Sequence, residues 1–101
     1  MVRVISLKLL REFWSRHPDA EIPLRQWYKL ATHARWQSLA ELRADLPQAD
    51  GVMNRRGETL TVFNTGGNKY RLIARIRYDY QLINVRAVLT HAEYDKGKWK
   101  E

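Results

Sequence analysis

The chain has 101 residues, of which 18 are Lys or Arg and 11 are Asp or Glu, so its net charge at neutral pH is +7; it contains no cysteine. This length and a hydrophobic content of 45% predict one folded domain over residues 1–101. The lack of cysteine excludes a disulfide scaffold, thiol catalysis and Cys-ligated metal sites. We find neither a transmembrane run nor a signal peptide, and therefore expect a cytoplasmic protein with no membrane partner.

The positive charge is concentrated in the second half of the chain. Residues 1–50 carry eight Lys or Arg against six Asp or Glu, whereas residues 51–101 carry ten against five. With a sequence pI near 10.1, this excess indicates attraction to a polyanion. Nucleic acid is the partner that the charge favours, and an anionic membrane or an acidic protein are the alternatives.

Apolar residues at helical spacing predict helices in the first half, after a short β-like segment at 2–5. The first helix spans about 7–16, with Ser6 placed to cap its first turn. The second spans about 22–34, because Pro23 is tolerated only in a first turn.

A capping box at Ser38-Leu39-Ala40-Glu41 predicts a short third helix. In this motif the serine oxygen accepts a hydrogen bond from the amide of Glu41, while the Glu41 side chain reaches back to the start of the helix. The helix is expected to end before Pro47.

From Asp50-Gly51 onward the apolar period changes to two, which predicts an antiparallel β-meander. The clearest strand, 69–78, has a core face of Tyr70, Leu72, Ala74, Ile76 and Tyr78. Its other face consists of Arg71, Ile73, Arg75 and Arg77. In the following strand we expect the core residues to be Ile83, Val85, Ala87 and Leu89. Arg86 then joins the basic face.

A second capping box, Thr90-His91-Ala92-Glu93, predicts a helical turn over 93–96 that Gly97 closes. The predicted fold is therefore α+β, with N-terminal helices packed on one face of a mostly antiparallel sheet and a short C-terminal helical turn. We expect the other sheet face to be solvated, because helices over it would bury arginines that have few carboxylates to pair with.

The arginines of this face are spaced for anion binding. Arg75 and Arg77 project about 7 Å apart, and Arg71 lies about 13 Å from Arg75. Guanidinium groups at this spacing can bind successive phosphates with two hydrogen bonds each. The alternative is a solvated face with scattered ion pairs.

His91 is the candidate for proton transfer, because it directly follows the strand that ends on the basic face and imidazole exchanges protons near neutral pH. Tyr94 follows three residues later on the same side of the turn, where its hydroxyl can orient a substrate. The structural alternatives are a histidine that hydrogen-bonds at a strand–helix junction and a core tyrosine. The three histidines lie in different predicted elements, so we expect no metal and no cofactor.

Two segments together resemble a known family. Residues 62–74 read VFNTGGNKYRLIA and residues 88–96 read VLTHAEYDK. The combination of FN-x-GGN-x-[YL]R with THxEYD is similar to the HigB-type mRNA interferases, toxins of type II toxin–antitoxin systems within the RelE/ParE superfamily. The likeness extends over nearly the whole chain, including the opening strand and the helical first half.

This resemblance implies both a fold and a function. It implies helices packed on an antiparallel sheet, in agreement with the periodicity. It also implies an endoribonuclease that binds the ribosomal A site and cleaves translated mRNA without a metal, by attack of the substrate's own 2′-OH. The implied partner is a HigA-type antitoxin with a helix-turn-helix DNA-binding domain.

Within that reaction we assign a role to each candidate residue. The phosphates are held, and the transition-state charge is stabilised, by Arg71, Arg75, Arg77 and Arg86, with help from Lys69. His91 is the general acid or base, and Tyr94 orients the nucleotide or shares the proton transfer. Asn64 and Asn68 contact bases or sugar, and a turn-forming role is equally open for Asn68.

Two other functions remain open at this point. A ParE-like gyrase inhibitor would have the same fold and no nuclease activity. A non-catalytic module would bind RNA or the ribosome through the arginine face, with a strong salt dependence and no cleavage products.

Overall fold

A five-stranded sheet forms the centre of the molecule, described here by a computed structural model of residues 3–67 and 69–100. Its strands are β1 (Arg3–Ile5), β2 (Asp50–Met53), β3 (Thr59–Thr65), β4 (Tyr70–Arg77) and β5 (Leu82–Thr90). They lie in the order β1-β5-β4-β3-β2. Strands β2 to β5 form an antiparallel meander and β1 adds in parallel to β5, so the predicted α+β fold is confirmed.

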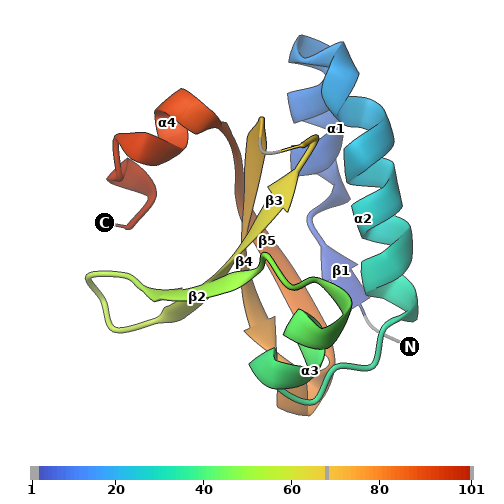
Figure 1. Cartoon of the computed structure of the whole chain (residues 1–101), viewed down its shortest axis with the longest axis vertical. Helices are drawn as coiled ribbons and strands as arrows, with labels where there is room; N and C mark the ends of the chain where they lie inside the picture. The colour runs from blue at the N-terminus through green and yellow to red at the C-terminus, as the bar shows by residue number, and fades with distance from the viewer. Residues whose placement is uncertain (1–2, 68, 101) are drawn as a thin grey trace.

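Helices α1 (Leu7–Arg16) and α2 (Glu21–His33) cover one face of this sheet, and α3 (Leu39–Asp45) lies beside β2 (Figure 1). The bounds of α1 match the prediction, and α2 begins one residue earlier than predicted. Single 3₁₀ turns follow α1 at Pro18–Ala20 and β4 at Tyr78–Tyr80. Within residues 3–67 and 69–100, we find no helix with both the length and the apolar character needed to cross a membrane.

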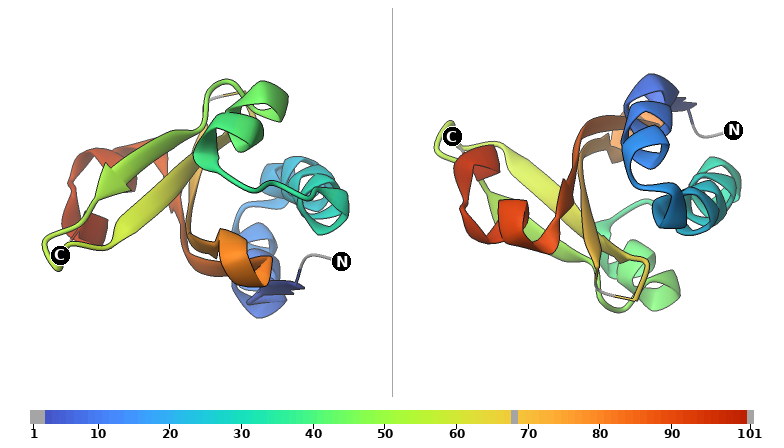
Figure 2. Two further views of the ribbon diagram at one scale, coloured as in Figure 1. Left: turned by 90° about the horizontal axis from the view of Figure 1, so that it is seen from below. Right: turned by 90° about the horizontal axis from the view of Figure 1, so that it is seen from above.

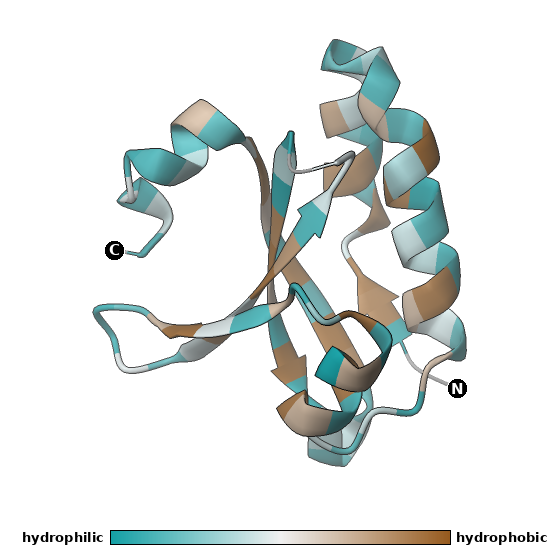
Figure 3. Cartoon of the chain, in the orientation of Figure 1, coloured by the Kyte–Doolittle hydropathy of each residue, from teal (hydrophilic) through white to brown (hydrophobic). Residues whose placement is uncertain are grey.

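The main core lies between these helices and the sheet. The helices bury Leu10, Phe13, Leu24, Trp27, Ala31 and Leu42 against it, and the strands bury Phe63, Leu72, Ala74, Ile83 and Val85. Figure 3 shows the hydrophobic residues concentrated on the central strands, while the helical turn near the C-terminus is mostly hydrophilic. Burial of this apolar surface is the dominant favourable term in folding.

The predicted core pattern of β5 is wrong beyond Val85, because the strand contains a β-bulge. Ile73 pairs with Ala87 and Ala74 pairs with Val85, so Arg86 is an extra residue without a register partner in β4. One extra residue reverses which face each later side chain occupies. Ala87 and Leu89 therefore leave the main core and lie on the second face of the sheet, and Val88 packs against the main core in their place.

The second face is also less open than predicted. Leu60, Val62 and Ile73 are buried there, and the side chains packed on them are Val52, Ala87, Leu89, Tyr94 and Trp99. Tyr94 and Trp99 come from α4 (His91–Asp95) and the 3₁₀ turn Lys98–Lys100. Figure 2 shows this C-terminal segment on the opposite side of the sheet from α1 and α2, with its end near the β2–β3 turn. The Arg55 amide donates to the Lys100 carbonyl at 2.8 Å and joins the two segments.

The capping predictions have mixed outcomes. Ser38 Oγ accepts from the Glu41 amide at 3.3 Å, and Thr90 and Glu93 form both bonds of a capping box. The capping box at Thr90 is confirmed, although α4 begins at His91, earlier than the predicted turn. At Ser38 only the serine half of the predicted box is confirmed, because Glu41 Oε1 accepts from the Gln37 amide at 3.1 Å and not from the Ser38 amide. Ser6 occupies the N-cap position of α1 but makes no side-chain cap bond, so that expectation is wrong.

Gly66, in the turn between β3 and β4, tests how tightly this end of the sheet is packed. Its φ is +60°, and an added Cβ would lie 3.1 Å from Cδ2 of Tyr70. Gly66→Ala should lower the free energy of unfolding by about 2–3 kcal/mol, measured by urea denaturation. Gly57 has a φ of +82° with nothing within 4 Å, so the control Gly57→Ala should cost only about 1 kcal/mol. If both variants lower the free energy of unfolding equally, the contact with Tyr70 is unimportant for stability.

Candidate functional site

Arg71 lies where β3, β4 and α4 meet. In register it is opposite Asn64 of β3 and Leu89 of β5. Its Cζ atom lies 5.3 Å from the centre of the Tyr94 ring, and its Nη1 donates to the Tyr70 carbonyl at 3.2 Å. A guanidinium held against an aromatic ring loses part of its rotational freedom. The structure therefore brings together three predicted residues: Arg71, Asn64 and Tyr94.

Helix α4 places His91 one turn before Tyr94. The His91 amide donates to the Lys69 carbonyl at 3.1 Å, which attaches the start of α4 to the turn before β4. His91 Nδ1 lies 3.0 Å from Oδ2 of Asp95, and both side chains are more than half exposed. Asp95 thus orients the imidazole from one turn away. The sequence analysis missed Asp95, although its i,i+4 spacing from His91 was a usable signal.

Arg75 and Arg86 share a single carboxylate in the middle of the second face. Their guanidinium nitrogens lie 3.1 Å and 3.0 Å from Oε2 of Glu58, while Asn54 donates to Oε1 at 2.9 Å. The hydrogen bond from Asn54, followed by the charges of Arg86 and Arg75, lowers the pKa of Glu58 below its ordinary value despite partial desolvation. Two guanidiniums on one carboxylate leave this position positively charged. No local sequence signal pointed to Glu58.

Two residues predicted to bind RNA, Lys69 and Arg77, have side chains that contact other parts of the molecule than Arg71 does. Lys69 is 2.9 Å from Asp19 in the 3₁₀ turn before α2, so it faces the helix layer. The Tyr70 hydroxyl also donates to Asp19, and these two bonds lower the pKa of the Asp19 carboxyl.

Arg77 lies at the far end of β4, about 20 Å from Arg71. It is 3.3 Å from Asp79 and stacks over the ring of Tyr80. Asn68 lies outside the described residues.

The C-terminal segment adds cations and an aromatic pair to the second face. The rings of Tyr94 and Trp99 stack 5.0 Å apart at 15°, and the Trp99 indole donates to the Tyr94 carbonyl at 3.0 Å. Exposed lysines follow Tyr94 at positions 96, 98 and 100, and Arg55 and Arg56 lie on the adjacent turn. Among the residues with described coordinates, no three His, Asp or Glu side chains converge as a metal site requires.

This arrangement suits a reaction on a phosphodiester. Arg71 supplies positive charge and donors for a phosphate, and His91 and Tyr94 supply groups that exchange or orient a proton. Arg75 and Arg86 continue the positive charge along the same face. The fold and this basic sheet end are those of a RelE-like toxin domain.

Comparisons with known proteins give the family. Residues 20–97 match the family described as HigB_toxin, RelE-like toxic component of a toxin-antitoxin system, and the chain belongs to it. The mRNA interferase HigB of Escherichia coli O6:H1 is 27% identical over 95 residues, covering 94% of this chain and 90% of that protein. The mRNA interferase toxin HigB of Escherichia coli K12 is also 27% identical, over 93% of this chain and 88% of that protein. The resemblance noted in the two sequence motifs is confirmed.

Glu58→Gln tests the carboxylate that joins Arg75 and Arg86. Because the fold lowers the pKa of Glu58, its ionised form stabilises the native state. This contribution is complete above the ordinary pKa of 4.5 and is lost as pH falls through the lowered value. The variant should therefore unfold at lower urea than the wild type at about pH 7, and this difference should shrink as the pH falls below 4.5.

The control for this prediction is Glu12→Gln, on the exposed side of α1, which should change stability little at either pH. If the urea midpoints of the Glu58 variant and the wild type differ by the same amount at every pH, the prediction is wrong.

Proposed function

We propose that this protein is the toxin of a type II toxin–antitoxin pair and acts as a ribosome-dependent, metal-independent endoribonuclease on translated mRNA. The observation that carries the proposal is the contact of Arg71 with Tyr94 at one end of the sheet, with His91 one turn earlier on α4. The proposal is supported by membership of the HigB toxin family and by relatives named mRNA interferases.

The reaction is attack of a ribose 2′-OH on the adjacent phosphorus. The 2′-oxygen loses its proton and bonds to phosphorus, the bond to the 5′-oxygen breaks, and that oxygen receives a proton, leaving a 2′,3′-cyclic phosphate and a 5′-OH. The crowded phosphate carries additional negative charge in the transition state. The positive charge of the Arg71 guanidinium, which Tyr94 and the Tyr70 carbonyl orient, stabilises this negative charge.

His91 serves as the general acid or base of this reaction. Its exposed ring can reach a bound strand, and the Asp95 carboxylate at Nδ1 fixes the ring so that the other nitrogen faces outward. Tyr94, on the same side of α4, orients the nucleotide or shares the proton transfer.

The remaining predicted residues bind RNA. Arg75 and Arg86 use the donors not engaged by Glu58 to hold flanking phosphates, and Asn64, opposite Arg71, contacts base or sugar. We assign Lys69 and Arg77 to phosphates outside the cleavage cluster, because they lie near Asp19 and Asp79. For Asn68 we retain the proposal that it contacts base or sugar.

The ribosome orders the message, which this exposed site does not do alone. Cleavage requires the 2′-oxygen, phosphorus and 5′-oxygen in line, and a flexible message rarely adopts this geometry. A message held in the ribosomal A site is already ordered, so the toxin has only to add charge and proton transfer. The antitoxin we propose is HigA-type, with a helix-turn-helix domain.

Substitutions at Arg71 and His91 test the proposal. His91→Gln should reduce cleavage of mRNA on translating ribosomes by about 10²–10⁴-fold because proton transfer is lost. Arg71→Ala should reduce it by about 10²–10³-fold because charge stabilisation is lost. Cleavage is measured by primer extension with purified ribosomes, and Arg43→Ala, on the exposed side of α3, is the control that should cleave normally.

The same assay separates the rival functions. Full activity of both variants would refute the assignment of these residues. Ribosome binding with intact message would indicate a non-catalytic module. Inhibition of DNA gyrase without loss of message would indicate a ParE-like toxin.

Asp95→Asn tests whether the carboxylate acts through His91. An exposed ion pair is worth up to about 1 kcal/mol, so the variant should lose about 2–5-fold in cleavage rate. In the His91→Gln background the same change should have no further effect, since there is no imidazole to orient. An equal loss in both backgrounds would show that Asp95 acts independently of His91.

A further inference from the structure

A series of side-chain contacts connects Arg71 on β4 to the 3₁₀ turn at Lys98–Lys100. The Cζ atom of Arg71 lies 5.3 Å from the centre of the Tyr94 ring, and this ring stacks on Trp99 at 5.0 Å and 15°. The Nζ atom of Lys100 lies 5.4 Å from the centre of the Trp99 ring. Tyr94 therefore contacts both Arg71 and Trp99, and only this one ring separates the indole from the guanidinium.

Backbone hydrogen bonds fix Trp99 from two directions. Its Nε1 donates to the Tyr94 carbonyl at 3.0 Å, which joins the C-terminal turn to the end of α4. The Arg55 amide donates to the Lys100 carbonyl at 2.8 Å, which joins the same turn to the β2–β3 turn. Gly97, with a φ of +73°, lets the chain reverse after α4. Figures 1 and 2 show the segment returning toward the β2–β3 turn.

Trp99 also packs on the sheet itself. It is one of the side chains that cover Leu60, Val62 and Ile73, the apolar cluster of the second face. These three residues belong to β3 and β4, so the position of the indole is set by strands and not by α4 alone. The indole is thus a fixed surface against which the Tyr94 ring can rest.

Helix α4 depends on contacts of this kind. It has only five residues, His91–Asp95, and none of them is buried. A helix this short is unstable alone in water, so its side chains take their positions from caps and tertiary contacts. The Thr90 capping box fixes its first turn. At its last turn, Trp99 supplies a ring for Tyr94 and a donor for the Tyr94 carbonyl.

We propose that Trp99 is a positioning residue of the nuclease site, which acts through Tyr94 on Arg71. The inference rests on the proposed function, because it extends the role given there to the Tyr94 ring. With the indole in place, the phenol ring stays against the guanidinium and the positive charge stays at one position. Without the indole, the ring can rotate into the space left behind, and Arg71 loses its support. A displacement of about 1 Å in a reacting group can lower a rate by about 10²-fold.

Two substitutions of Trp99 test this proposal. Trp99→Leu retains an apolar cover over the cluster of the second face and removes the aromatic face and the indole N–H. It should lower kcat for cleavage of mRNA on translating ribosomes by about 10- to 100-fold, with KM within about threefold of the wild type. Trp99→Phe retains a ring for Tyr94 and loses one hydrogen bond, so its kcat should stay within about fivefold of the wild type.

Trp14→Leu is the matched control. Trp14 is also partly buried and also lies beside a guanidinium, that of Arg25 at 4.8 Å, but it packs against the main core on the helix side of the sheet. The same substitution there should leave kcat within about twofold of the wild type. Circular dichroism establishes that each variant is folded, and cleavage is compared below the lowest unfolding temperature.

A second experiment removes the ring through which Trp99 acts. In the Tyr94→Ala background, Trp99→Leu should cause no further loss of kcat, because there is no ring to position. An equal loss in both backgrounds would overturn the proposal. Normal kcat of Trp99→Leu would also overturn it, since the indole would then only cover the apolar cluster. So would a loss confined to KM, which would show that Trp99 binds a base of the message directly.

The Arg71 side chain gives a readout that is independent of cleavage. The Tyr94 ring shields nearby protons, so the Nε–H resonance of Arg71 in a ¹H–¹⁵N spectrum, assigned by Arg71→Lys, should lie upfield of that of free arginine. Trp99→Leu should move it toward the free position, and Trp99→Phe should leave it near the wild-type position. If the wild type cleaves no RNA, the proposed function fails, and this spectrum still decides whether Trp99 positions Arg71. An Arg71 resonance that Trp99→Leu leaves in place would overturn the proposal.

Discussion

The arrangement of the molecule depends on the single extra residue in β5. By adding Arg86 to the strand, the bulge turns Ala87 and Leu89 onto the second face of the sheet, where they extend the apolar cluster of Leu60, Val62 and Ile73. Exposed apolar surface of this extent is unfavourable, so the C-terminal segment covers it with Tyr94 and Trp99. Packing of this segment on the sheet places Tyr94 against Arg71 and attaches the His91 amide to the Lys69 carbonyl. The bulge also turns Arg86 toward Glu58.

Carboxylates on this face position the cations without neutralising the face. Glu58 serves both Arg75 and Arg86, so each guanidinium is oriented while one net positive charge remains. Asp95 orients the ring of His91 through its contact with Nδ1. An oriented cation loses less conformational entropy when it binds a phosphate, which favours recognition of a highly charged substrate. The many donors of arginine make this sharing possible.

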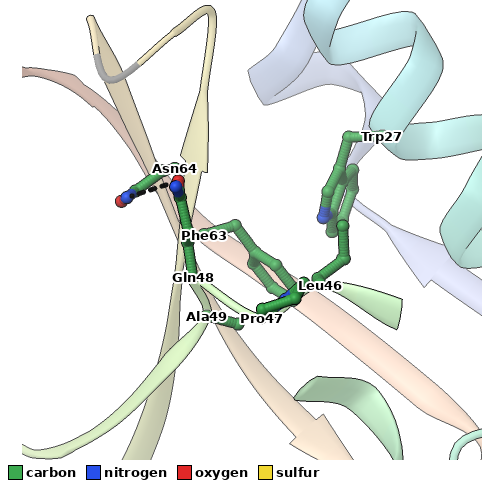
Figure 4. Close-up of a pocket in the computed structure, with 7 residues that line it drawn as sticks. All are labelled: Trp27, Leu46, Pro47, Gln48, Ala49, Phe63 and Asn64. Atoms are coloured by element: carbon green, nitrogen blue, oxygen red, sulfur yellow. Dashed lines mark hydrogen bonds between the residues drawn. The ribbon is translucent and has the colours of Figure 1, made fainter. Parts of the chain in front are cut away.

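The two sides of the sheet differ in character. The face under α4 is basic, partly aromatic and exposed at its rim, as a site for a nucleic acid strand should be. The helix side is mainly apolar, because α1 and α2 bury their core residues there. Asn64 borders both sides, since it is opposite Arg71 in register and also lines the depression beside Trp27 (Figure 4).

The sequence by itself determined the local features of this protein. The bounds of α1, the Ser38 N-cap of α3, the capping box at Thr90 and the alternation along β4 all follow from interactions between residues a few positions apart, and all were predicted. The family motifs identified the toxin class for the same reason, because they are short continuous segments. The tertiary structure alone decided the reversal of faces in β5, the pairing of Glu58 with Arg75 and Arg86, and the covering of the second face by Trp99. Each of these depends on strand register or on contact between distant segments, which alternation along one strand does not reveal.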